Sequence, residues 1–276
     1  MNSFPNFPST AITVEMWVRT AQSGEFGLIS YSIIDNEFLI YHKATDMDIY
    51  INTTPVTVPV TVNDGKWHHL AVTWKSADGS LKVYKDGVLA ATTTLLTGAS
   101  IASGGSLYLG EEQDGPGNLD PSQRLHGYYD EVRIWSIVRT ASQIASRKDC
   151  ELNGNETGLV LYYKMNETGS GSGITVLNSA TSTGNILNAT TTGPTVAFGI
   201  NSKYTQPFNG VFSFNGTDQA AVTPSAVLSN ASVFTIEFWV NTLQSGSTAN
   251  YWTNPTLIGN ENGNAPDNDF GITLGK

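Results

Sequence analysis

Residues 11–19 read Ala11-Ile-Thr-Val-Glu-Met-Trp-Val-Arg19, with apolar side chains at every second position. This period of two predicts a β-strand with one buried face. The stretch Trp67-His-His-Leu-Ala-Val-Thr-Trp74 is similar and follows the turn-forming residues Asn63-Asp-Gly-Lys66. Asp86-Gly87 separates two further strand-like stretches, and this dipeptide is typical of a hairpin turn in which Gly takes a positive φ.

Short alternating stretches continue along the chain. We expect further strands at Glu37–Tyr41, Asp48–Asn52, Val56–Val62, Leu81–Tyr84, Val88–Thr94, Leu107–Leu109, Tyr129–Trp135 and Gly158–Met165. One short helix is expected after Thr140, because Thr140-Ala-Ser-Gln143 has the spacing of a capping box. Strands at intervals of about 8–12 residues predict an all-β protein, an antiparallel two-sheet jelly-roll sandwich with one short helix.

Composition excludes several classes of protein. Among 276 residues there are 14 basic and 24 acidic side chains, and the net charge is −10. This balance argues against nucleic acid and against an anionic membrane surface as partners, but it suits divalent cations. The single cysteine, Cys150, excludes a disulfide within the chain and a cysteine-based zinc site. No apolar run is long enough for membrane insertion, and Met1–Thr10 lack the pattern of a secretory signal, so the chain is expected to begin inside a domain.

An internal repeat defines the expected domains. Phe234-Thr-Ile-Glu-Phe-Trp-Val-Asn-Thr-Leu-Gln-Ser-Gly246 resembles residues 12–24, and Asp267-Asn-Asp-Phe270 resembles Asp35-Asn-Glu-Phe38. We therefore expect a first module at 1–165 that lacks its opening strands, a Gly/Ser/Thr/Asn-rich linker at 166–210, and the truncated start of a second module at 211–276. Residues 212–222 have no counterpart in the first copy, so they either belong to a separate half-module or complete the first module.

Two acidic segments carry the candidate chemistry. Asp35-Asn36 opens an expected strand, and Gly110-Glu-Glu-Gln-Asp-Gly-Pro-Gly-Asn-Leu-Asp-Pro-Ser-Gln123 is a turn-rich loop. Carboxylate and amide oxygens are the ligands that Ca²⁺ takes in proteins. Clustered carboxylates also repel one another unless a cation neutralises them. The alternative is that both segments are solvated loops on an acidic protein.

The order of these motifs resembles the pentraxins, a branch of the laminin-G-like, concanavalin A-like jelly rolls. The motifs are Ser30-Tyr-Ser, Asp35-Asn-Glu-Phe-Leu-Ile-Tyr41, Leu109-Gly-Glu-Glu-Gln-Asp114 and Gly127-Tyr-Tyr-Asp-Glu-Val-Arg-Ile-Trp135. The resemblance covers about residues 10–165 and restarts near 211. It implies two adjacent calcium ions on one sheet face, with the helix on the opposite face.

Position by position, the resemblance implies a calcium ligand set. Asp35 and Asn36 would bind the first ion, and the main-chain carbonyl of Gln113 would join them. Glu112 and Asp114 would bridge both ions, and Asp120 and Gln123 would complete the second. Asp120 stands where the family has Glu, in a loop one residue shorter, and Glu15 and Ala71 occupy the places of the family's disulfide cysteines. Tyr41 is expected to offer an aromatic face to a ligand.

The expected function is calcium-dependent binding of a carbohydrate or phosphorylated ligand, or of an extracellular protein, outside the cell or at its surface. The alternative is a structural or adhesion repeat of a tandem surface protein. A glycoside hydrolase of the same fold is disfavoured, because the Glu-x-Asp-x-x-Glu arrangement of the glucanases is missing. Glu15 and Glu237 are lone strand glutamates, and Asp130 and Glu131 are neighbours that face opposite ways. We therefore expect no enzyme.

Overall fold

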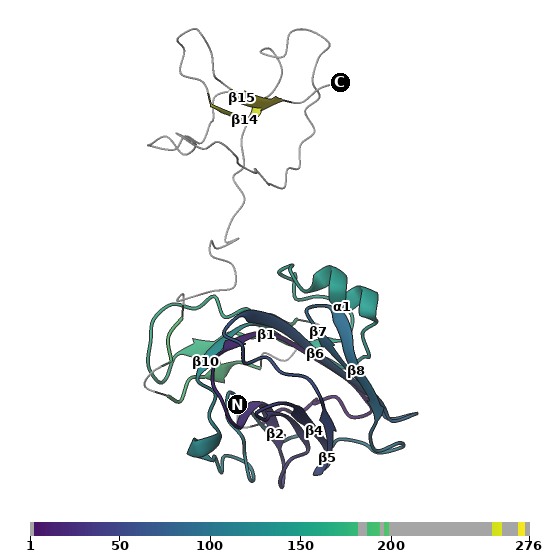
Figure 1. Ribbon diagram of the computed structural model, residues 1–276. Coiled ribbons are helices and arrows are strands. Elements are labelled where there is room, and N and C mark those ends of the chain that lie inside the picture. The colour runs from purple at the N-terminus through teal and green to yellow at the C-terminus, as the bar shows by residue number, and fades with distance from the viewer. Residues whose placement is uncertain (1–2, 182–186, 194–195, 199–255, 261–269, 274–276) are drawn as a thin grey trace. The chain divides into compact units, whose positions relative to one another are not determined.

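The computed structural model describes residues 3–181, 187–193, 196–198, 256–260 and 270–273. The chain divides into two compact units, Met1–Val211 and Phe212–Lys276. The described part of the first unit is built of two antiparallel sheets that face each other (Figure 1). The two-sheet antiparallel sandwich predicted from the alternating stretches is confirmed.

The larger sheet has six strands. Their order across the sheet is β11 (Leu159–Tyr163), β10 (Gly127–Trp135), β1 (Ala11–Thr20), β6 (Trp67–Lys75), β7 (Ser80–Lys85) and β8 (Val88–Thr94). The smaller sheet has five, in the order β5 (Thr54–Val58), β4 (Met47–Ile51), β3 (Phe38–His42), β2 (Phe26–Ser32) and β9 (Ser106–Leu109). A single 3-10 turn, η1 (Pro121–Gln123), lies in the loop between β9 and β10.

The main core fills the space between the sheets. On β1, the alternation puts Ile12, Val14, Met16 and Val18 into this core, where all four are completely buried. The strand's other face, with Thr13, is buried as well, because the chain after β10 covers it. The hydroxyl of Thr13 donates to the Ile137 carbonyl at 2.7 Å.

The short helix α1 (Ala141–Arg147) has the capping box that its sequence predicts. The Thr140 hydroxyl accepts from the Gln143 main-chain N–H, and the Gln143 side chain accepts from the Thr140 N–H. The helix lies on the outer side of the larger sheet (Figure 1), where Ile144 packs with Ala71 and Tyr84.

Glu15 and Ala71 are direct neighbours on β1 and β6, as the cysteines of a disulfide across these strands would be. In place of a covalent bridge, the fully buried Glu15 carboxylate lies 3.4 Å from His69 Nε2 and 3.3 Å from Arg139 Nε. The Arg139 guanidinium offsets part of the cost of burying this charge.

The packed module extends beyond residue 165, which corrects the expected domain boundary. β12 (Thr175–Val176) pairs with β13 (Ala189–Thr190) inside the segment expected to be a linker. Val176 and Leu187 are buried in the main core, and the Tyr163 hydroxyl donates to the Leu187 carbonyl at 2.9 Å. The polar composition of the segment misled the prediction, because only a few of its side chains are apolar and a subset of these, Val176 and Leu187 among them, packs into the core while Leu177 stays exposed.

In the second unit, the described residues form a hairpin of β14 (Thr256–Asn260) and β15 (Phe270–Thr273). Its register is interrupted between Thr256 and Ile258, and the β2–β3 hairpin is interrupted in the same way between Gly27 and Ile29. The strand pairing of both hairpins begins beside the repeated Asp-Asn motif. The repeated segment 234–246 and residues 212–222 lie outside the described residues.

Candidate metal centre

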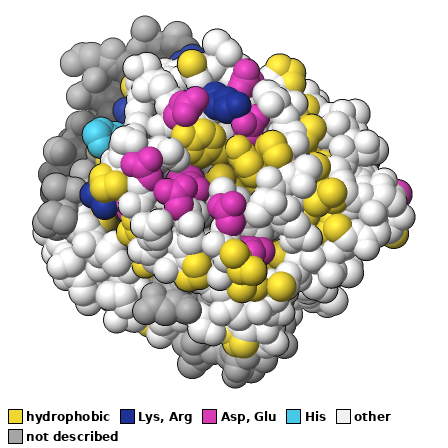
Figure 2. Space-filling view, turned by 90° about the horizontal axis from the view of Figure 1, so that it is seen from below, with side chains coloured by type: hydrophobic (Ala, Val, Ile, Leu, Met, Phe, Trp, Pro, Cys, Tyr) yellow, Lys and Arg dark blue, Asp and Glu magenta, His cyan; other side chains and the backbone are white. Residues whose placement is uncertain are grey.

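Two loops of the first unit meet beside the smaller sheet. A Cβ on Gly27 of β2 would lie 2.7 Å from the Glu112 nitrogen, and one on Gly115 would lie 3.3 Å from the Ile34 carbonyl oxygen. The missing side chains thus let the loop after β9 lie against β2 and the β2–β3 loop. Figure 2, which views the molecule from the side of the smaller sheet, shows Asp and Glu side chains gathered on this face.

Gln113 fixes the loop after β9 to the sheet. Its completely buried side-chain amide donates to the Ser30 carbonyl at 3.0 Å and accepts from the Ser106 hydroxyl at 2.5 Å and from the Gly117 N–H at 3.1 Å. Because the side chain is used in this way, the main-chain carbonyl is the atom through which Gln113 can reach a cation.

Glu112 is a buried carboxylate with other negative charges around it. Its side chain is 4% exposed, and its Oε2 has no hydrogen-bond partner among the described residues. Burial raises the pKa of Glu112 to about 7, and the charge of Asp114 adds to this effect, as do Asp35 and Asp120; the Asn36 amide acts in the opposite direction. The neighbouring carboxylates thus disfavour a negative charge on Glu112.

Asn36 supplies a second buried oxygen without a partner. Its Oδ1 is buried and accepts no hydrogen bond from the described residues. A buried acceptor without a donor is costly, and a hard cation satisfies such an oxygen as well as a donor does. The donor set of carboxylate, amide and carbonyl oxygens therefore fits Ca²⁺.

The side chains of Asp120 and Gln123, which were expected at the second ion, are hydrogen-bonded to each other. Asp120 Oδ2 accepts from Gln123 Nε2 at 3.0 Å, and its Oδ1 accepts from the Ser122 N–H at 2.8 Å as the cap of η1. Hydrogen bonds from Ser122 lower the pKa of Asp120. A second ion would have to compete with these bonds.

The carboxylates share one face without enclosing a common point. In the part of the chain that the structure describes, no three His, Cys, Asp or Glu side chains are grouped closely enough to hold a metal ion.

Tyr41 does not present the exposed aromatic face that was expected. It is 7% exposed, and its hydroxyl donates to Glu25 Oε2 at 3.0 Å. Tyr50 on β4, which the sequence interpretation missed, is only half-buried. Its pKa is raised by burial first, and the charges of Glu112 and Asp35 contribute, so it lies within their field. The alternation Asp48-Ile49-Tyr50 was the available signal, because it puts Tyr50 on the outer face of the sheet.

Comparison with known proteins agrees with this architecture. Residues 1–145 match the model of the concanavalin A-like lectin/glucanases superfamily. The chain is 36% identical over 146 residues to sushi, von Willebrand factor type A, EGF and pentraxin domain-containing protein 1 of Rattus norvegicus, covering 49% of this chain and 4% of that protein. It is 33% identical over 149 residues to neuronal pentraxin-2 of Homo sapiens, covering 52% of this chain and 35% of that protein.

A solved structure shares the fold. The full extracellular region of zebrafish Gpr126/Adgrg6 superposes with a TM-score of 0.50 at 18% identity, covering 72% of this chain and 25% of that one. No helix in the described residues has the length and apolar character needed to cross a bilayer. The chain spans about a third or less of the length of the two curated relatives. It belongs to the concanavalin A-like lectin/glucanases superfamily and is homologous to the pentraxins.

Proposed function

We propose that the first unit is a calcium-dependent binding module for a carbohydrate or phosphorylated ligand, acting outside the cell or at its surface. The observation that carries this proposal is the pair of buried oxygens without a hydrogen-bond partner among the described residues, Glu112 Oε2 and Asn36 Oδ1, in the field of carboxylates that raise the pKa of Glu112. If these loops served only as protein surface, the burial of two oxygens without hydrogen-bond partners would be a free-energy cost with no compensation.

Asp35, Asn36, Glu112, Asp114 and the Gln113 carbonyl would hold the ion. Bound Ca²⁺ would take the hydroxyl or phosphate oxygens of a ligand at the coordination positions that the protein leaves open. Tyr50, half-buried on the same face, would contact the apolar side of a sugar ring. Asp120 and Gln123 would serve a second ion only after giving up their mutual hydrogen bond.

Hydrolysis is not supported by the carboxylates of the larger sheet. Glu131 is buried in contact with Arg133 and accepts from the Tyr162 hydroxyl at 2.6 Å. Glu15 is enclosed between His69 and Arg139. Neither carboxylate is accessible to a glycosidic bond, so we propose a binding function rather than catalysis.

A structural or adhesion repeat is the second candidate. The observation that favours it is the same bulged register in the β2–β3 and β14–β15 hairpins, which supports a tandem array of modules. In that case calcium would stiffen the loops without presenting a ligand.

The test is the thermal stability of the whole chain and of Glu112→Gln, each in millimolar calcium and in chelator. Linkage predicts that calcium stabilises the wild type by about 0.5–3 kcal/mol, because only the folded chain places the two acidic loops on one face of the molecule. Glu112→Gln should be more stable than the wild type in chelator, since it removes a buried negative charge, and should not respond to calcium.

Asp149→Asn, which removes one exposed negative charge elsewhere, is the matched control and should respond to calcium as the wild type does. Equal wild-type midpoints in calcium and in chelator would rule out the metal centre. A calcium response without retention on immobilised sugars or phosphate esters would favour the structural repeat.

A further inference from the structure

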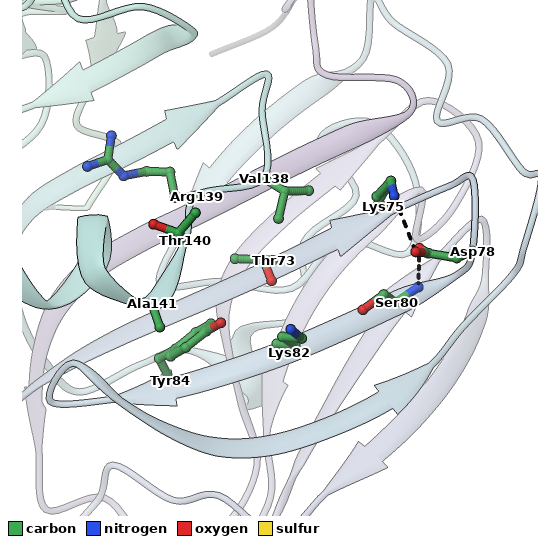
Figure 3. A pocket seen from close by; sticks show the side chains of 10 residues that line it. All are labelled: Thr73, Lys75, Asp78, Ser80, Lys82, Tyr84, Val138, Arg139, Thr140 and Ala141. Carbon is green, nitrogen blue, oxygen red and sulfur yellow. Dashed lines mark hydrogen bonds and ion pairs between the residues drawn. The ribbon is translucent and has the colours of Figure 1, made fainter.

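The outer face of the larger sheet carries a polar hollow beside α1. Its volume is about 350 Å³, and it lies between strands β6 and β7 and the segment 138–141 that leads into the helix (Figure 3). The candidate metal centre lies beside the smaller sheet, so this hollow is a separate feature of the first unit.

Strand register puts the polar residues of the hollow on one face. Thr73 of β6 is directly opposite Lys82 of β7, and Lys75 is opposite Ser80. Because side chains alternate along a strand, Tyr84 shares the face of Lys82. The wall is fixed by the Thr13 hydroxyl, which accepts from the Arg139 N–H at 2.9 Å.

Two side chains of the hollow carry hydroxyl groups that have no hydrogen-bond partner among the described residues. Thr73 is 2% exposed and Tyr84 is 3% exposed, and neither hydroxyl oxygen is among the fully buried atoms that lack a partner, so both can be reached from the hollow. Figure 3 shows both hydroxyl oxygens pointing toward Lys82. Burial raises the pKa of Tyr84, so its hydroxyl keeps its proton and can donate. Two hydroxyl donors that face the hollow are therefore available to an acceptor.

The charge of the hollow is opposite in sign to that of the chain. Lys75, Lys82 and Arg139 line it against one carboxylate, Asp78, in a protein of net charge −10. Lys75 Nζ lies 3.2 Å from Asp78 Oδ2, and Arg139 Nε lies 3.3 Å from Glu15 Oε1. Lys82 forms no ion pair with any described carboxylate, so its ammonium group is available.

We propose that this hollow binds the oxyanion group of a sulfated or phosphorylated sugar, with Lys82 as the cation and the hydroxyls of Thr73 and Tyr84 as donors. A tetrahedral oxyanion accepts several hydrogen bonds from different directions, which matches three donors that converge from two strands. The volume of the hollow leaves room for the sugar that carries the group. This site needs no calcium.

Isothermal titration calorimetry in calcium-free buffer tests the proposal on the whole chain. The probes are glucose 6-sulfate, glucose 6-phosphate, neutral glucose and inorganic sulfate. We expect the two charged sugars to bind and neutral glucose not to bind. Inorganic sulfate should bind more weakly than glucose 6-sulfate if the sugar contributes, and added salt should weaken every interaction.

Lys82→Gln and Tyr84→Phe should each weaken binding of the charged sugars by about tenfold, because each removes one donor to a charged acceptor. Tyr84→Phe keeps the packing of the ring against Ile144, so its fold is preserved. Lys66→Gln is the control for loss of a positive charge elsewhere. Absence of binding, equal binding of neutral glucose, or equal losses in Lys66→Gln and Lys82→Gln would overturn the proposal.

Discussion

His42 is a titratable side chain that the fold keeps neutral. It is completely buried, and its ring stacks on Phe26 with the ring centroids 4.4 Å apart. Burial lowers the pKa of His42. The unfolded chain therefore binds this proton more readily than the folded chain, so the stability contributed here is complete above the ordinary histidine pKa and is lost as the pH falls below it.

We expect His42→Phe to lose less stability than the wild type when the pH is lowered from about 7 to about 5, because the phenyl ring keeps the stack and cannot be protonated. The measurement is the difference between the unfolding free energy of His42→Phe and that of the wild type at each pH. This difference isolates His42 from buried carboxylates such as Glu112, whose raised pKa gives the opposite dependence. His126→Gln, at an exposed histidine, is the control, and parallel pH profiles for His42→Phe and the wild type would contradict the prediction.

Single residues of the candidate centre differ in how far the sequence could predict them. Glu112 and Asn36 stood out because oxygen ligands in acidic loops are chemically recognisable, and each has one buried oxygen without a partner among the described residues. Gly27 did not stand out, because its role is the absence of a side chain where the Glu112 nitrogen approaches. The burial of Tyr41 also depends on tertiary contacts, among them its bond to Glu25.

At the scale of elements, the loop after β9 depends on Gln113. Gln113→Met keeps the volume but removes the bonds to Ser30, Ser106 and Gly117. We expect a loss of about 2–4 kcal/mol of unfolding free energy, since buried polar groups of the neighbours are left unpaired. The calcium response should also weaken, although the removed side chain is not a proposed ligand.

Urea unfolding in calcium and in chelator measures both effects. Gln143→Met, the same substitution in the capping box of α1, should cost about 1 kcal/mol and leave the calcium response unchanged. A Gln113→Met variant with the full wild-type response would show that the loop keeps its position without this side chain.

Strands whose apolar and polar side chains alternate were predictable even where both faces are buried. β1 was recognised by its period of two, although nearly all of its residues are buried. β2 was missed because its sequence, Phe26-Gly-Leu-Ile-Ser-Tyr-Ser32, shows no regular alternation. The capping box located α1 because it is a local signal. The common bulge of the β2–β3 and β14–β15 hairpins supports the proposed repeat, whose remaining residues lie largely outside the described part of the chain.

For the whole molecule, the extent of the first unit is the property that composition predicted least well. Residues 166–210 were expected to be a linker, yet Val176 and Leu187 are part of the core. Apolar burial depends on which few side chains reach the sandwich, whereas composition averages over the segment. The two candidate sites, the metal centre and the hollow beside α1, are both built on this unit.

We expect the stable module to end beyond residue 165. A chain that stops at residue 198 should be more stable than one that stops at 165 by about 3–6 kcal/mol, since burying two aliphatic side chains contributes about 1.5–3 kcal/mol each. Urea unfolding of both fragments gives this difference. In the whole chain, Val176→Ser with Leu187→Ser should reproduce most of it, whereas Thr175→Ser, at an exposed position of β12, should not. Equal stability of the two fragments would mean that the segment acts as the linker its composition predicts.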